Sequence, residues 1–434
     1  MKIILIIAVI NCLASSSKAE KAYINISNPF LKKVPIAVPI FKNLSVEGDS
    51  NILIEGADLI ASTLDFTSYF RIIERKNFLE QADAIGITIS DIKFQNWKTI
   101  GADFIITGGL KEKDSIIDLE LRLFDRIEEK MILGRKYTGR ITDLKTIIRK
   151  FCNEVILILS NNKGIFETKI AFVSTGTGNK EIYMCDFNGD EPKQVTNNKA
   201  ITLSPALSSD GNWIAYTSYL KGKPDLYIKH LKENRGSVVS FEGINISPAW
   251  LPGQAVLGAT LSKSGDPEIY LISVSGKIVK RLTNSWGIDV SPTFSPEGKK
   301  MAFVSKRSGT PQIFIQNVES GDAERITFEG QYNTCPAWSP NGNKIAYTAM
   351  IDGKFNICLI DIKTKEVTQL TKDSGDNEDP SWSPEGNFIV FSSTREGSSR
   401  IYVMTALGTN QRRLIMMQGD QSSPEWSNFT VNIE

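Results

Sequence analysis

The chain holds few of the residue types that carry out enzymatic chemistry. It has a single histidine, His230, and it contains neither a G-x-S-x-G nor a G-x-x-x-x-G-K-[ST] sequence. These absences argue against a Ser-His-Asp hydrolase and a phosphate-binding loop. The four cysteines beyond the N-terminal segment form no CxxC pair, which argues against zinc and thioredoxin-like chemistry. We therefore expect no catalytic residues, no metal, no cofactor and free, mostly buried thiols.

One acidic stretch has the chemistry of a cation site. Asp373, Asp376, Glu378 and Asp379 are close together in the sequence, and carboxylate oxygens are the ligands that Ca²⁺ prefers. Their spacing differs from that of an EF-hand loop, and a solvated loop between two repeats is the simpler interpretation. The sequence leaves both interpretations open.

The first 19 residues are typical of a secretory signal peptide. Lys2 precedes an apolar run, and small residues lead to Ala19, after which we expect cleavage. Cys12 would suit a lipoprotein, but Asn11 stands where a small residue is expected. No later segment is long and apolar enough to span a bilayer, and 50 basic residues balance 49 acidic ones. We expect an exported, soluble protein with no membrane insertion and no nucleic-acid partner.

A repeat of about 44 residues dominates the second part of the chain. Its marker is a Pro followed two residues later by an apolar side chain, aromatic in all but the first copy. The copies are Ser204–Leu207, Ser247–Trp250, Ser291–Phe294, Cys335–Trp338, Asp379–Trp382 and Ser423–Trp426. Each marker is followed by a turn and by runs that alternate as strands do, giving four short strands per repeat. This spacing is typical of the blades of a β-propeller.

The two ends of the repeat array complement each other. Residues 170–196 contain strands two to four of a repeat without the first, whereas Ser423–Trp426 begins a repeat that stops there. The C-terminal segment can therefore supply the inner strand of the first blade and close a ring of six blades. We interpret the aromatic residue of each marker as packing between blades rather than as a sugar-stacking platform.

Residues 20–160 lack this repeat and mix strand and helix patterns. Alternating or apolar runs at 23–27, 36–40, 104–108, 116–124 and 130–138 predict strands, and the periodicity of 53–64 and 142–159 predicts helices. The predicted fold is thus an α/β N-terminal domain over 20–160, a linker over 161–169, and an all-β six-bladed β-propeller over 170–434.

The repeat S-P-x-W-S-P-x-G-x-x-I-A-[FY]-x-S resembles the propeller of the TolB family, and N-terminal segments support the resemblance. These segments are Pro35–Phe41, Gly101–Gly108 and Leu121–Asp125, followed at the domain junction by Lys163–Ala171. The chain departs from the family pattern at Ile148-Arg149-Lys150-Phe151, where the last helix of the family often carries a histidine. The resemblance implies a monomeric, non-enzymatic component of the Tol–Pal system in the periplasm, which supports outer-membrane integrity and cell division.

The resemblance also implies two partners: the peptidoglycan-associated lipoprotein Pal, bound by the propeller, and the inner-membrane protein TolA, bound by the N-terminal segment. Loops that lead into the inner strands must emerge beside the central channel, so we expect the Pal-like partner to bind there. The candidate residues are Asn245, Asp289, Asn333, Asn377 and Glu378.

Tyr23, Ile24 and Ile26 are the candidates for binding the TolA-like partner, within an arm over residues 20–30 whose two-faced pattern suits pairing with a sheet edge. Such an arm either docks and is released or forms a static first strand. An alternative class of function is a secreted propeller hydrolase or lyase, or a propeller that gates a peptidase. It would require ionisable groups converging in a pocket at the channel mouth. A lectin-like propeller would require exposed tryptophans.

Overall fold

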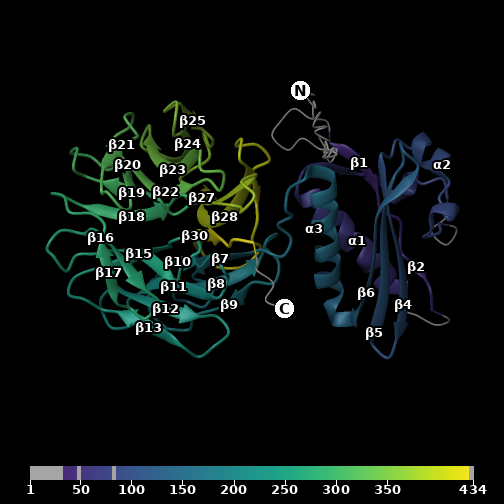
Figure 1. Ribbon diagram of the computed structural model, residues 1–434, viewed down its shortest axis with the longest axis horizontal. Coiled ribbons are helices and arrows are strands. Elements are labelled where there is room, and N and C mark those ends of the chain that lie inside the picture. Colours follow the sequence, from purple (N-terminus) through teal and green to yellow (C-terminus); the bar gives the residue numbers. More distant parts are fainter. Residues whose placement is uncertain (1–32, 46–49, 81–84, 430–434) are drawn as a thin grey trace, which may run out of the picture.

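The computed structural model describes residues 33–45, 50–80 and 85–429. It shows an α/β domain beside a six-bladed β-propeller (Figure 1). The proposed signal peptide and the arm residues Tyr23, Ile24 and Ile26 lie outside the described residues.

The N-terminal domain is a mixed sheet with two long helices on one face. Its strands are β1 (Val34–Ala37), β2 (Lys42–Asn43), β3 (Phe70–Ile72), β4 (Phe104–Lys113), β5 (Ile116–Asp125) and β6 (Lys130–Arg140). Its helices are α1 (Ser50–Phe66), α2 (Phe94–Thr99) and α3 (Leu144–Ser160), with short 3-10 turns at Arg75–Asn77, Ile89–Asp91 and Ile141–Asp143. The sheet order is β3-β1-β4-β5-β6, with β2 paired to β4. The short β2, β3 and α2 were not predicted from the sequence.

Helices α1 and α3 lie between this sheet and the propeller (Figure 1). The periodic apolar residues of α3, such as Ile148 and Phe151, are fully buried, so the predicted amphipathic faces do form the core. Phe41 packs where two glycines leave room: a Cβ added to Gly56 or Gly108 would come within 2.4 Å of its ring. The sheet and α1 therefore approach each other through these two glycines.

The propeller consists of six four-stranded antiparallel sheets, here numbered as blades from the inner strand outward. Blade 1 has β30 (Gln421–Trp426), β7 (Lys169–Ser174), β8 (Glu181–Asp186) and β9 (Lys193–Gln194); blade 2 has β10 (Thr202–Leu207), β11 (Trp213–Ser218), β12 (Asp225–His230) and β13 (Gly236–Val239). Blade 3 has β14 (Asn245–Trp250), β15 (Val256–Leu261), β16 (Glu268–Ser273) and β17 (Ile278–Arg281); blade 4 has β18 (Asp289–Phe294), β19 (Lys300–Ser305), β20 (Gln312–Asn317) and β21 (Ala323–Arg325). Blade 5 has β22 (Asn333–Trp338), β23 (Lys344–Ile351), β24 (Lys354–Asp361) and β25 (Val367–Gln369); blade 6 has β26 (Asn377–Trp382), β27 (Phe388–Glu396), β28 (Ser398–Thr405) and β29 (Arg412–Arg413).

The ring closes as the complementary ends of the repeat array predicted. β30 pairs antiparallel with β7, with Gln421 opposite Ser174 and Trp426 opposite Ile170. Every inner strand contacts the next, and β30 contacts β10. The first and last parts of the propeller thus share one sheet, which leaves no open edge between them.

The aromatic residues of the repeat are buried between blades, in agreement with the packing interpretation. Trp250 donates its indole N–H to the Ala206 carbonyl of the preceding inner strand at 3.0 Å. Trp382 makes the same bond to Ala337 at 3.0 Å. Since the indole N–H is satisfied by a neighbouring blade, each of these tryptophans joins two sheets and is not available to stack on a sugar.

The fourth strands of blades 3 and 4 are short. β17 ends at Arg281 and β21 ends at Arg325, although Leu-Thr or Ile-Thr follows each of them. Beyond the end of β17, a side chain bonds to the third strand: Thr283 Oγ1 accepts a hydrogen bond from the Ile269 amide at 2.9 Å. Thr327 Oγ1 does the same for Ile313.

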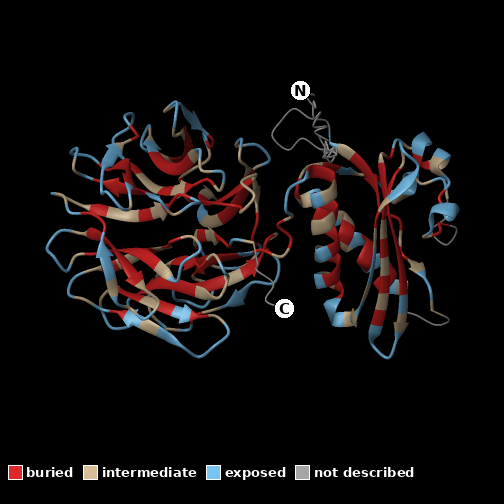
Figure 2. Ribbon diagram, in the orientation of Figure 1, coloured by how far each residue is buried: buried red, intermediate tan, exposed pale blue. Residues whose placement is uncertain are grey.

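The two domains share a continuous apolar core. Phe66 at the end of α1 contacts Phe187 edge-on at a centroid distance of 4.9 Å and lies 5.7 Å from Phe388. Phe166 of the linker packs on the same Phe187 ring at 5.2 Å. Figure 2 shows buried residues along both sides of the junction. The interface is therefore held by packing as well as by charge.

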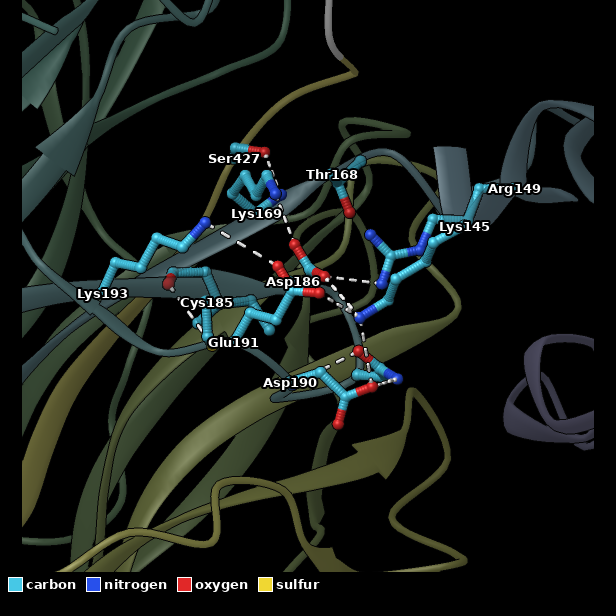
Figure 3. Close-up of polar contacts among 12 residues, drawn as sticks. Lys145, Arg149, Thr168, Lys169, Cys185, Asp186, Asp190, Glu191, Lys193 and Ser427 are labelled. Carbon is cyan, nitrogen blue, oxygen red and sulfur yellow. Dashed lines mark hydrogen bonds and ion pairs between the residues drawn. The ribbon is translucent and has the colours of Figure 1, made fainter. Parts of the chain in front are cut away.

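Ion pairs between the domains converge on Asp186, the last residue of β8 (Figure 3). Its carboxylate, 2% exposed, accepts a hydrogen bond from Arg149 of α3 at 2.6 Å and pairs with Lys169. Lys145 of α3 lies 3.4 Å away. Burial alone would raise the pKa of Asp186, but the bonds and charges of Arg149 and Lys169 outweigh burial and lower that pKa to about 2. Arg149 of α3 thus forms an ion pair with Asp186 across the domain interface.

Candidate functional site

The structure brings the five predicted propeller residues to one end of the inner strands. Asn245, Asp289, Asn333 and Asn377 each occupy the first position of an inner strand, and Glu378 follows Asn377. Loops into the inner strands and loops between the second and third strands emerge at this same end, because the strands alternate in direction. We call this end of the propeller the mouth face.

Four of these five side chains are buried and do not reach the surface. Asn245, Asp289, Asn333 and Asn377 are at most 1% exposed, whereas Glu378 is partly exposed. Each of the four bonds to the loop that precedes it. Examples are Asn333 Nδ2 to the Glu329 carbonyl at 2.8 Å and Asn377 Nδ2 to the Gly375 carbonyl at 3.1 Å. Because these four side chains are buried and bonded to the loops, they shape the loops of the mouth face; a direct contact with a partner stays a prediction.

Asp289 shows why these polar residues are needed. Its carboxylate accepts hydrogen bonds from Arg307 at 2.7 Å and from Ser285 at 2.9 Å. Ser285 belongs to the loop entering β18, and Arg307 to the loop leaving β19. A buried charge requires such partners, so one side chain fixes the relative position of two loops on the mouth face.

Several large apolar side chains are exposed on the mouth face, beside charged ones such as Lys306 and Glu329. Trp286, Met416 and Phe328 are 84%, 77% and 65% exposed, and all three lie in loops that enter inner strands. Further exposed apolar residues at this end of the blades are Ile201, Tyr219, Leu220, Tyr332 and Met350. Large exposed apolar side chains gathered on one face are typical of a protein-binding surface.

The opposite end of the propeller differs. Among the described residues, Leu407 is the single large apolar side chain that is exposed in the loops at that end. The sequence contains a signal for this asymmetry, since the aromatic residues Trp286 and Phe328 lie in loops, outside the predicted strands. They lie outside the repeated positions and were not predicted as site residues.

The acidic stretch lies at the mouth end of β26 and in the loop before it. Asp376 accepts the Phe355 amide at 3.0 Å. Burial, together with the charges of Asp379 and Asp376, raises the pKa of Glu378 to about 7. In the described ranges, no three Asp, Glu, His or Cys side chains are placed to hold one metal ion. The geometry is that of a structured loop between two blades.

A cavity of about 430 Å³ occupies the other end of the channel. Prolines, small side chains and the repeat aromatics line it, and Glu425 is the sole ionisable side chain among the described residues that do so. Burial raises the pKa of Glu425 to about 7. The other blades carry Ala, Thr or Ser at its position. The Ser381 hydroxyl donates a hydrogen bond to Glu425 at 3.2 Å, but no second ionisable side chain among the described residues lines the cavity. One carboxyl and one hydroxyl do not form an acid–base or nucleophile–base pair.

His230 and the cysteines have structural roles. His230 is buried at the end of β12, where Nδ1 accepts the Glu233 amide at 3.0 Å and the ring meets Trp213 edge-on. Cys152, Cys185 and Cys358 are free and buried, and Cys335 is free and partly exposed. No helix in the described part of the chain is long and apolar enough to cross a membrane.

These features define a class of protein: an α/β domain packed against a six-bladed propeller whose mouth face carries exposed apolar side chains. Residues 158–430 match the TolB β-propeller domain, and residues 22–132 match the TolB amino-terminal domain. The chain belongs to the TolB family.

Individual relatives agree with this assignment. The chain is 57% identical over 284 residues to a Tol-Pal system protein TolB of Desulfosudis oleivorans, an alignment that spans 65% of each chain. It is 45% identical over 220 residues to a TolB homolog of Chlorobaculum tepidum, which covers 51% of this chain and 49% of that one. The crystal structure of TolB from Acinetobacter baumannii superposes with a TM-score of 0.79 at 25% identity, over 92% of this chain and 97% of that one. The aligned stretches thus span less than two thirds of the length of these two sequence relatives.

Proposed function

We propose that the chain is a periplasmic, non-enzymatic scaffold of the Tol–Pal system. In this role the propeller binds a Pal-like outer-membrane lipoprotein and the N-terminal arm binds a TolA-like inner-membrane protein, which supports outer-membrane integrity and division. The observation that carries the proposal is the gathering of exposed apolar side chains on the mouth face. Family membership supports the identity of the partners.

The mouth face suits a folded partner domain. Trp286, Phe328 and Met416 come from loops of three different blades, so one partner surface would contact several of them together. Buried polar side chains such as Asp289 and Asn377 hold these loops in place through hydrogen bonds before a partner binds. Loops that are already ordered lower the entropic cost of association. Glu378 is the predicted residue that remains available to contact the partner.

We expect Trp286→Ala to weaken binding of the Pal-like periplasmic domain by about 30-fold. Aromatic residues that become fully desolvated contribute about 2 kcal/mol or more to an interface. Titration calorimetry with the purified domain measures the effect, and the melting temperature should stay unchanged because the side chain is 84% exposed.

Leu407→Ala is the matched control for this experiment, since Leu407 is 51% exposed at the opposite end of the propeller. It should bind as the wild type does. Equal affinity for Trp286→Ala, Phe328→Ala and the wild type would exclude the mouth face as the binding surface.

A groove between the domains supports the second half of the proposal. It has a volume of about 320 Å³ and is lined by Lys33, Asp65, Phe66, Ser68, Asn410, Gln411 and Arg412. Lys33 is the first described residue, so the arm over residues 20–30 joins the chain close to this groove. We infer that the arm docks there in one state and is released to the TolA-like partner in another. Ordering costs about 1–2 kcal/mol per residue, so a small differential contact can shift the balance.

Binding of the Pal-like domain is expected to change amide hydrogen exchange across residues 20–30. The reason is linkage: if the partner favours one state of the arm, the arm's exposure must follow. Exchange measured by mass spectrometry with and without the domain tests this prediction. Identical protection in both samples would leave the arm as a static strand and would remove the proposed coupling.

A further inference from the structure

A small cavity separates two polar atoms at the junction of the domains. It is lined by Tyr69 and Ile156 of the N-terminal domain, linker residues 162–166, and Glu385 and Phe388 of blade 6. The Tyr69 hydroxyl and Glu385 Oε2 are both buried and have no hydrogen-bond partner among the described residues. The cavity offers about 10 Å³ to the centre of a water molecule, which is room for one water.

Glu385 faces this cavity without a compensating cation. Its other oxygen accepts a hydrogen bond from Ser383 at 2.9 Å. The cation that lines the cavity is Lys163 of the linker, whose ammonium lies 5.5 Å from the Phe429 ring. The ion pairs of the described residues include none to Glu385. A carboxylate enclosed in this way is disfavoured, and a neutral carboxyl is preferred.

The chain contains the same turn in a solvated setting. Ser383-Pro384-Glu385-Gly386 of blade 6 and Ser295-Pro296-Glu297-Gly298 of blade 4 have identical sequences. Glu297 is exposed, whereas Glu385 is partly buried and its Oε2 is fully buried at the cavity that the N-terminal domain and the linker line. The enclosure of Glu385 is therefore a property of the domain interface and not of the turn.

We propose that Glu385 and Tyr69 form a proton-operated latch between the two domains. When the Glu385 carboxyl is protonated, it donates a hydrogen bond to the Tyr69 hydroxyl or to a water molecule held between them, and the domains stay docked. When the carboxyl is ionised, the enclosed charge has no partner and docking weakens. The latch goes beyond the proposed function and does not depend on either partner.

The pKa values of the groups at the interface support the proposal that docking weakens as the pH rises. Burial raises the pKa of Glu385 to about 7, against the smaller opposing effect of its hydrogen bonds. Burial and the charge of Glu385 raise the pKa of Tyr69, which therefore stays neutral. Two other acids that pair with α3 across the interface have lowered pKa values: the pKa of Asp186 is about 2, and the hydrogen bond from Lys145 lowers the pKa of Glu191. Both are therefore ionised between pH 5 and 8. Because the pKa of Glu385 is higher when docked, docking is strongest below pH 5 and weakens up to pH 7.

The experiment must report on the domain interface alone. Glu378 and Glu425 also have a pKa of about 7, so their titration would contribute to the pH dependence of a global melting curve. Amide exchange of peptides covering residues 161–168 is measured at pH 5.5 and 8.5 and divided by the intrinsic rate at each pH. In the full chain, we expect protection to fall by about tenfold or more at the higher pH, since one unit of pKa corresponds to a factor of ten.

Glu385→Gln should show the high protection of the protonated form at both pH values, because glutamine is neutral and can donate. Glu297→Gln, in the identical exposed turn, should behave as the wild type. Tyr69→Phe should keep the fold and reduce the pH-dependent difference, since the neutral carboxyl loses its partner. Protection that is equal at both pH values in the wild type, or a pH dependence that survives in Glu385→Gln, would overturn the latch.

Discussion

Removal of residues 421–434 is expected to lower the melting temperature by about 10 °C or more. This change deletes β30, the inner strand of blade 1, and exposes the edge of β7. It also removes Trp426, which is 4% exposed and donates its indole N–H to Thr168 at 2.9 Å. Loss of a buried tryptophan alone costs about 3–5 kcal/mol, a large part of the stability of a typical domain. Differential scanning calorimetry measures the change.

A shorter truncation is the control, because it shortens the C-terminus without removing the strand that closes the ring. Deletion of residues 430–434 leaves β30 and Trp426 in place and should change the melting temperature by no more than about 2 °C. If the protein lacking 421–434 melts as the full chain does, the C-terminal strand does not close the ring in solution.

The second large effect is expected for Asp186→Asn, which we predict to destabilise the protein by about 3 kcal/mol. The substitution leaves Arg149, 11% exposed, and Lys169 beside a neutral group. Removing one member of a buried ion pair costs about 3–5 kcal/mol because the other charge stays buried without a partner. Chemical denaturation measures the free energy of unfolding, and amide exchange of α3 shows whether the interface opens.

In the wild type, acid should weaken the ion pairs of Asp186 by protonating its carboxylate. The pKa of Asp186 is about 2 in the folded protein and near 3.8 when exposed, so its stabilising contribution is complete above pH 4 and is lost as the pH falls through 2. We expect the wild type to lose about 2 kcal/mol more than Asp186→Asn over that range.

Asp190→Asn is the control for this pair of experiments. Asp190 lies 3.7 Å from the Lys145 ammonium, but its side chain is 56% exposed. An exposed pair contributes little, so this variant should stay within about 0.5 kcal/mol of the wild type. An equal loss in both aspartate variants would mean that burial of Asp186 is not what makes the contact strong.

The propeller architecture could be predicted from the sequence because it produces a periodic pattern of residues. A Pro and an apolar residue recurring about every 44 residues predict blades, since each sheet must bury both faces against its neighbours. The incomplete repeats at 170–196 and 423–426 predicted the pairing of β30 with β7, which the structure contains. In the N-terminal domain, the long strands β4, β5 and β6 and both long helices were predicted for the same reason.

The binding surface was harder to predict because a repeat defines positions and not exposure. Asn245, Asp289, Asn333 and Asn377 precede each marker and vary in type, which suggested contact residues. In the structure they are buried, because the loop ahead of each inner strand folds back over its first residue. Trp286 and Phe328, outside the repeat, are the side chains left exposed.

The blades, the closed ring and the lack of common catalytic motifs follow from the order and types of the residues, because periodicity and residue supply can be read along the chain. Features that depend on neighbours far apart in the chain required the folded structure. The residue before each marker Pro adopts positive φ, as in Ser247 (53°) and Asp379 (54°), against the usual preference before proline. It lies at a β-bulge, where the register between the inner and second strands shifts. Likewise, two identical turns place one glutamate in solvent and the other at the domain junction, because burial is set by what packs against a residue.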